Sequence, residues 1–204
     1  MRKEKQIYLI VDPSMEINEL CTKLDLILKT KVFAVQIWDH FEKEENVENI
    51  VIKIKSICNK NNVPILINNR WDLANKFDLD GIHFDEIPFN YDSIKNLFDN
   101  KIKGITLTNN LETIEWLNRN EFNYISFCSI FPSTTSNSCE YVQLDTIKKA
   151  TKIFKNSIFL AGGINLETID KLKDLEFDGV AVISGIMNAS NPSKTIQLYN
   201  NKLN

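Results

Sequence analysis

The chain has 204 residues, which suits one domain, and its 43% hydrophobic content is enough for a sizeable core. A formal net charge of -3 provides no basic surface, so we expect no nucleic-acid partner. The first apolar run, residues 7–11, is far shorter than the about 20 apolar residues of a membrane span and too short for a signal peptide. The cysteines are scattered without a C-x-x-C pair, so we expect reduced thiols, a cytoplasmic location and no membrane partner.

Short apolar runs alternate with amphipathic segments along the whole chain. The runs have the length of strands, most are rich in Ile and Val, and few alternate with polar residues, which is typical of parallel strands covered on both faces. They are residues 7–11, 32–37, 64–67, 81–84, 104–107, 124–127, 158–161 and 180–183. Between them, apolar residues spaced by three and four predict helices over residues 17–28, 47–57, 91–98, 111–117, 144–154 and 166–175.

Eight strands, each followed by a helix, in about 200 residues indicate an α/β protein with a single (β/α)8 TIM barrel over residues 1–204. A doubly wound open sheet is the alternative, because one sequence does not reveal the order of its strands. Both folds bind ligands at the carboxyl ends of the strands. The residues directly after each apolar run are therefore the candidates for function.

Glycine is concentrated near the end of the chain. Gly162 and Gly163 follow the seventh run, with Asn165 as a candidate cap of the next helix, and Ser184 and Gly185 follow the eighth run. Two helix N-termini side by side, with backbone N–H groups facing outward, form an anion site, and barrels commonly bind phosphate there. We therefore predict phosphate binding, with loop turning as the alternative role of these glycines.

The loop after the sixth run is rich in small hydroxyl side chains. Ser133 and Thr135 lie in the segment "SIFPSTTSNS", directly after Pro132. Hydroxyl donors and backbone N–H groups of such a loop suit phosphate oxygens, although an ordinary polar surface loop has the same composition.

The motifs "VQIWDH", "INNRWDLA", "DGIHFDE", "GITLTN", "IFPSTTS", "LAGGIN" and "DGVAVISGI" follow one another along nearly the whole chain. In order and spacing they resemble the thiamine phosphate synthases, whose sister branch is the thiazole tautomerases. The resemblance implies a single-domain (β/α)8 barrel that joins a pyrimidine methyl diphosphate to a thiazole phosphate. Such an enzyme releases pyrophosphate with the help of Mg2+, and its partner is a small phosphorylated heterocycle. A homo-oligomer is compatible with the sequence.

The resemblance also assigns roles to individual residues. The thiazole phosphate would be held by two hydroxyl residues, a ligand-touching glycine and a backbone pair after strand 8: Ser133, Thr135, Gly163, Ile183 and Ser184. Gln36 and Asn68 match contacts to the pyrimidine diphosphate, and Thr106 stands where the family has a serine near the pyrimidine. Thr106 and His40 are the candidate catalytic residues, and His83 is expected to form hydrogen bonds inside the barrel mouth.

Departures from the family pattern all concern the diphosphate. Trp38 and His40 occupy the places of two cations, and Ser136 that of a third. Asn69 and Pro88 replace two carboxylates that bind the metal, so Mg2+ is expected from the resemblance but has only Asn69 and Asp85 as remaining ligands here. Cations and Mg2+ stabilise a leaving pyrophosphate, so their loss predicts weak or altered synthase activity.

Two further functions stay open. The same losses fit a non-catalytic binder or regulator that recognises a phosphorylated ligand. An isomerase that acts on a thiazole intermediate, with His40 as general base, is the third hypothesis. Trp38 either stacks on a flat heterocycle or fills the space of the lost diphosphate.

Overall fold

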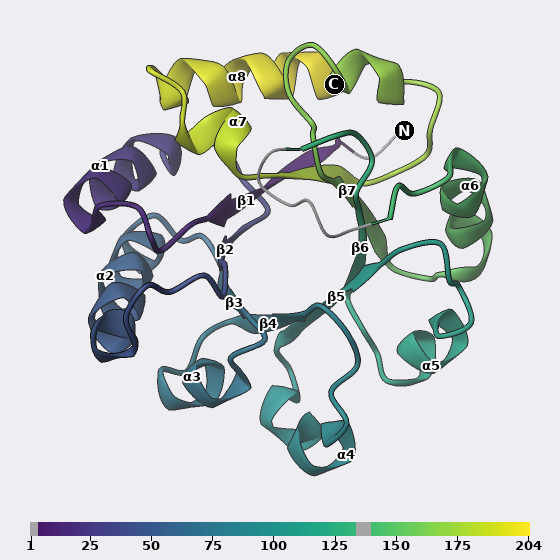
Figure 1. Cartoon of the computed structure of the whole chain (residues 1–204), viewed down its shortest axis with the longest axis horizontal. Helices are drawn as coiled ribbons and strands as arrows, with labels where there is room; N and C mark the ends of the chain where they lie inside the picture. Colours follow the sequence, from purple (N-terminus) through teal and green to yellow (C-terminus); the bar gives the residue numbers. More distant parts are fainter. Residues whose placement is uncertain (1–3, 134–139) are drawn as a thin grey trace.

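The structure, a computed structural model that describes residues 4–133 and 140–204, is a closed barrel of eight parallel strands arranged in chain order (Figure 1). The strands are β1 Gln6–Val11, β2 Ala34–Ile37, β3 Ile65–Asn68, β4 Gly81–Phe84, β5 Ile102–Leu107, β6 Tyr124–Cys128, β7 Ser157–Ala161 and β8 Gly179–Val182. β8 closes the barrel by pairing with β1, where Gln6 lies opposite Gly179. The predicted (β/α)8 TIM barrel is confirmed, and the open sheet was the wrong alternative.

Helices form an outer ring around the strands (Figure 1). They are α1 Ile17–Ile27, η1 Glu44–Asn46, α2 Val47–Lys60, α3 Trp71–Lys76, α4 Tyr91–Ile94, η2 Lys95–Phe98, α5 Ile114–Arg119, α6 Leu144–Ile153, η3 Ile169–Leu172, α7 Ser184–Met187 and α8 Pro192–Leu203, where η marks a 3-10 helix. No helix in the described ranges is both long and apolar enough to cross a membrane.

The helix predicted over residues 166–175 is wrong in type and length, since the segment forms only the 3-10 helix η3. Side-chain bonds to the backbone explain the difference. The Thr168 hydroxyl donates to Gly163 O at 2.9 Å, and it accepts from the Asn165 N–H at 2.9 Å. Such local bonds compete with regular helix. Asn165 does act as a cap, because its Oδ1 accepts from the N–H groups of Glu167 and Thr168 at 2.8 and 3.0 Å.

Two apolar clusters stabilise the barrel. The larger one lies between the strands and the outer helices and is mainly aliphatic. The smaller one fills the barrel interior with Tyr8, Leu66, Tyr124 and Phe159, together with three alanines. Tyr8 lies opposite Ala34 on β2 and Ala181 on β8, so small neighbours make room for its ring. As a result, two buried tyrosine hydroxyls lie at the centre of the barrel, below its carboxyl end.

Candidate functional site

Two adjoining cavities open at the carboxyl end of the barrel. The β7–β8 cavity has a volume of about 330 Å3 and is lined by residues after β6, β7 and β8. The central cavity has a volume of about 370 Å3 and lies over β1 to β6. Both are lined by Ile10, Cys128, Ala161 and Ile183. We call the two cavities together the mouth of the barrel. Its two ends are polar, and the residues shared between them are mostly apolar.

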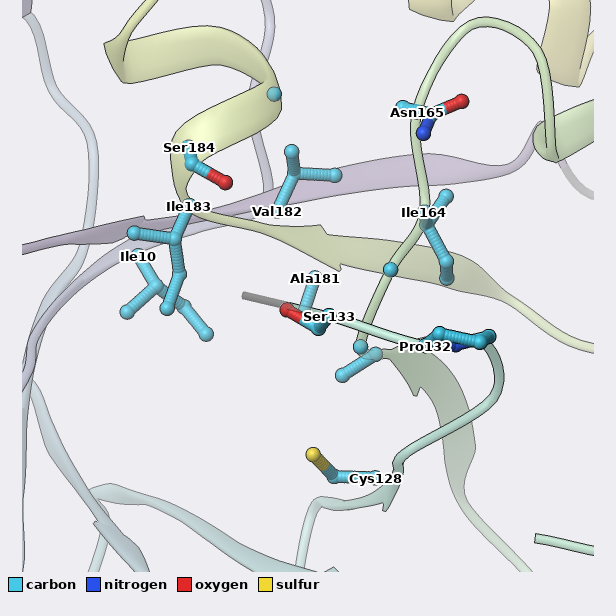
Figure 2. A pocket seen from close by; sticks show the side chains of 14 residues that line it. Ile10, Cys128, Pro132, Ser133, Ile164, Asn165, Ala181, Val182, Ile183 and Ser184 are labelled. Atoms are coloured by element: carbon cyan, nitrogen blue, oxygen red, sulfur yellow. The ribbon is translucent and has the colours of Figure 1, made fainter. Parts of the chain in front are cut away.

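Backbone and small side chains make up the β7–β8 cavity. Its lining includes Pro132, Ser133, Gly162, Gly163, Ile164, Asn165, Val182, Ser184 and Gly185. Figure 2 shows the Ser133 side chain, from the segment after β6, and the Ser184 side chain, at the start of α7, around the same open space. The N–H groups of Gly162, Gly163 and Gly185 donate no hydrogen bond to another described residue, and no charged side chain is among the lining residues. This end suits an anion that is bound by N–H and O–H donors.

Local backbone geometry accounts for the glycines of this cavity. Gly162 and Gly163 have φ angles of +87° and +65°, in the left-handed region that glycine adopts readily. A Cβ would lie 2.3 Å from Ser129 Oγ at Gly162, and 2.4 Å from Pro132 O at Gly163. The turn after β7 therefore packs directly against the loop after β6. Packing alone requires these glycines, so phosphate binding at this turn stays a prediction.

The two helices whose N-termini were predicted to bind phosphate are shorter than expected. α7 begins at Ser184 but has only four residues, and η3 begins at Ile169, well beyond the glycine pair. Helices this short contribute little dipole. The expected attraction for an anion therefore comes from individual N–H groups.

A chain of hydrogen bonds runs beneath the central cavity. Tyr8 Oη donates to Gln36 Oε1 at 2.6 Å, and the Tyr8 and Tyr124 hydroxyls lie 2.6 Å apart. His83 Nδ1 is 2.8 Å from Tyr124 Oη, and His83 Nε2 is 2.9 Å from Thr106 Oγ1. The expected hydrogen bonding of His83 is thus confirmed.

Burial keeps the members of this chain uncharged. It lowers the pKa of His83 from 6.5 to about 4, against the opposing effect of Asp85. It also raises the pKa of both Tyr8 and Tyr124 well above the ordinary value. Tyr8 and Tyr124 were not among the predicted site residues. A tyrosine inside a buried strand was the available signal, because its hydroxyl needs a partner there.

A second polar cluster joins the ends of β3 and β4. Asp85 Oδ1 accepts from Asn68 Nδ2 at 3.0 Å, and Asp85 Oδ2 accepts from Asn69 Nδ2 at 2.7 Å. Asn69 Oδ1 in turn accepts from the Asp85 N–H at 3.0 Å. Asn69 and Asp85 are therefore hydrogen-bonded to each other, and both Asp85 carboxylate oxygens accept from amide groups.

These residues do not fit Mg2+. The ion requires several oxygen ligands in nearly octahedral geometry, whereas Asp85 is engaged with two amide groups that would repel a cation. Across residues 4–133 and 140–204, no group of three or more His, Cys, Asp or Glu side chains could hold a metal ion.

The described residues that line the two cavities also include no Lys or Arg. The only charged side chain among the described residues that line the two cavities is Asp85. Arg70 lies near the end of β3, but it donates to Glu44 at 2.7 Å and to Asp72 at 3.2 Å. Its charge is therefore already compensated.

Trp38 and His40 lie next to each other after β2 but differ in position. Trp38 lines the central cavity, whereas His40 is among the lining residues of neither cavity. The ring centroids are 4.5 Å apart with an angle of 33° between the planes, and His40 Nδ1 lies 3.0 Å from Asp12 Oδ1. Asp12 and Trp38 thus hold the imidazole at the rim.

Comparison with known proteins decides the family. The model of the family described as thiamine monophosphate synthase matches residues 7–186. The chain belongs to this family. It is 28% identical over 187 residues to the thiamine-phosphate synthase of Methanobrevibacter smithii, covering 91% of this chain and 89% of the relative. It is 31% identical over 169 residues to that of Picrophilus torridus, covering 80% and 81%. The thiamine phosphate pyrophosphorylase of Pyrococcus furiosus has the same fold, with a TM-score of 0.82 and 20% identity over 98% of this chain and 96% of that one.

In this member of the thiamine monophosphate synthase family, most predicted site residues surround the mouth. Gln36, Trp38, Asn68, Thr106, Asp85 and Ile183 line the central cavity, and Ser133, Gly162, Gly163, Ile183, Ser184 and Gly185 line the β7–β8 cavity. Asn69 lies next to them through Asp85, His40 lies outside both linings, and Thr135 is outside the described residues. Their roles in binding and catalysis stay predictions.

Proposed function

We propose that this family member binds a thiazole phosphate or thiamine phosphate and couples the thiazole to a pyrimidine methyl diphosphate only weakly. The phosphate would bind in the β7–β8 cavity and the ring system would extend into the central cavity. The observation that carries the proposal is the continuity of the two cavities through Ile10, Cys128, Ala161 and Ile183. A ligand with a phosphate at one end and flat rings at the other matches a mouth with N–H donors at one end and amide and hydroxyl groups at the other.

The central cavity is poorly equipped to release pyrophosphate. When the bond between the pyrimidine methylene carbon and the diphosphate oxygen breaks, negative charge accumulates on the leaving group. Gln36 can offer neutral amide donors, whereas Asn68 Nδ2 already donates to His83 O and to Asp85. Asp85 adds a negative charge, and the described lining contains no Lys or Arg. Loss of one preorganised donor costs on the order of 3 kcal/mol, about a hundredfold in rate. Loss of a whole set predicts very slow coupling.

Binding and coupling are tested separately. Isothermal calorimetry should detect thiazole phosphate or thiamine phosphate at millimolar concentration, and absence of binding by both would refute the proposal. A synthase assay should give a low rate for the wild type and a higher rate for Trp38→Arg combined with Asn69→Asp. The matched control, Trp38→Phe with Asn69→Ser, changes the same positions without restoring charge and should gain nothing.

A non-catalytic binder is the second candidate, and the lack of Lys and Arg among the described lining residues favours it. Formation of thiamine phosphate by the purified wild type above background would exclude this candidate. An isomerase with His40 as base is favoured by the Asp12–His40 contact, but the position of His40 outside both cavities argues against it. Turnover of a thiazole substrate that is undiminished in His40→Ala would exclude His40 as its base.

A further inference from the structure

Five residues form one continuous chain of hydrogen bonds through the barrel interior: Gln36, Tyr8, Tyr124, His83 and Thr106. Gln36, Tyr8, Tyr124 and His83 are each at most 4% exposed, so the three bonds among them are buried, whereas the His83–Thr106 bond is partly buried. The two ends, Gln36 and Thr106, line the central cavity together with Tyr8 and His83, and Tyr124 is not among its lining residues. The direction of the hydrogen bond at Gln36 therefore affects whether Thr106, at the other end of the hydrogen-bond chain, presents a donor or an acceptor to a ligand.

Gly104 on β5 leaves room for contact between His83 on β4 and Tyr124 on β6. In the sheet register, His83 lies opposite Gly104, and Gly104 lies opposite Tyr124. Because Gly104 has no side chain, the His83 and Tyr124 rings stack across β5 at this position, with centroids 5.6 Å apart and an angle of 18° between the planes. A Cβ at Gly104 would lie 1.9 Å from Tyr124 Cζ and 2.3 Å from its hydroxyl.

The direction of every bond follows from the first one. Tyr8 has one hydroxyl proton and donates it to Gln36 Oε1, so its oxygen must accept from Tyr124. Tyr124 has then used its own proton, and its oxygen must accept from His83 Nδ1–H. A neutral His83 that carries its proton on Nδ1 has a bare Nε2, which must accept from the Thr106 hydroxyl.

This direction determines what a ligand meets. Gln36 Oε1 already accepts from Tyr8, so we expect Gln36 to contact a ligand through its amide N–H groups. The Thr106 proton points to His83, so Thr106 can contact a ligand only through the lone pairs of its oxygen. A ring that meets both groups along its N3–C4 edge needs an acceptor at N3 and an N–H donor at C4, as in a 4-aminopyrimidine, whereas a 4-oxopyrimidine has the reverse pattern.

We propose that Tyr8 and Tyr124 are positioning residues that fix the direction of this hydrogen-bond chain and thereby select an amino-substituted over an oxo-substituted ring in the central cavity. The choice of ring ligand rests on the proposed function. The direction of the chain does not, because it is a property of the free protein and can be measured without a ligand.

Nitrogen-15 NMR of the histidine side chains tests the direction. The chain contains only His40 and His83, so spectra of His40→Gln assign the His83 signals directly. We expect Nδ1 to carry the proton and Nε2 to be bare at neutral pH. In Tyr124→Phe, Nδ1–H loses its acceptor, and we expect the proton to move to Nε2 with Thr106 as acceptor. Tyr91→Phe is the matched control, because the buried Tyr91 hydroxyl makes no hydrogen bond to a described residue. A wild-type His83 protonated on Nε2 would overturn the inference.

Calorimetry with thiamine phosphate and its 4-oxo analogue tests the selectivity, since the two ligands share the phosphate and the thiazolium ring. We expect the wild type and Tyr91→Phe to bind the amino form at least about tenfold more tightly. The ratio should fall towards one in Tyr124→Phe and Tyr8→Phe. Equal affinities in the wild type, or an unchanged ratio in both variants, would overturn the inference. If the wild type binds neither ligand, the proposed function fails, and the NMR result alone decides the direction of the chain.

Discussion

Tyr124 Oη on β6 lies 2.8 Å from His83 Nδ1 on β4, although β5 runs between them, because the intervening residue is glycine. We therefore predict that Gly104→Ala displaces the Tyr124 ring and lowers the free energy of unfolding by about 1–3 kcal/mol. Urea denaturation measures the loss. In a Tyr124→Ala background the clash is absent and the same substitution should cost almost nothing. Equal losses in the two backgrounds would show that Tyr124 is not the obstacle.

His83 should make stability depend on pH. Its pKa is 6.5 in the unfolded chain and about 4 in the folded one, so between these values the unfolded state binds more protons. This stability is fully present above pH 6.5 and is lost as the pH falls towards 4, by about 3 kcal/mol in total. Urea denaturation of the wild type and His83→Gln across this range isolates the effect, since the carboxylates are common to both. Parallel curves for the two proteins would contradict the prediction.

The turn after β7 should be sensitive to a single methyl group. Gly163→Ala places a side chain at a φ of +65° and against Pro132 O, so we expect both lower stability and at least about tenfold weaker binding of thiazole phosphate. Asn100→Ala is the matched control, because Asn100 has a φ of +66° in the turn that precedes β5, at the opposite end of the barrel. It should lower stability without changing the affinity. Weaker binding in both variants would point to a general loss of structure.

Because Asn69 and Asp85 are hydrogen-bonded to each other, we predict that Mg2+ does not change the stability of the wild type. The melting temperature of the wild type should be the same in EDTA and in millimolar Mg2+. Asn69→Asp keeps the side-chain shape but replaces an amide donor with a second carboxylate beside Asp85, so Mg2+ should raise the melting temperature of this variant. Asn69→Ser, which adds no charge, is the control. Stabilisation of the wild type by Mg2+ would contradict the description of this cluster.

The strands and the side of the barrel that carries the site follow directly from the sequence. Parallel strands covered on both faces are continuous apolar runs, and β4 coincides with the predicted residues 81–84. Polar residues at or just after the carboxyl ends of such runs must meet at one end of the barrel, which brings Gln36, Asn68 and Thr106 to a common cavity.

Side-chain contacts between strands could not be predicted from the sequence in the same way. The pairing of Asn69 with Asp85, and of Tyr124 with His83 across Gly104, depends on register and ring orientation, which a single sequence does not specify. The helix predicted over residues 166–175 failed for a related reason. Its apolar spacing is helical, but bonds between the Thr168 side chain and the backbone of the preceding turn decide the local structure.

A crystal structure of the wild type soaked with thiamine phosphate tests the central claim most directly. We expect the phosphate in the β7–β8 cavity, within hydrogen-bond distance of the N–H groups of Gly163 and Gly185, and the aminopyrimidine ring in the central cavity between Gln36 and Thr106. A phosphate bound elsewhere while the β7–β8 cavity stays empty would contradict the account.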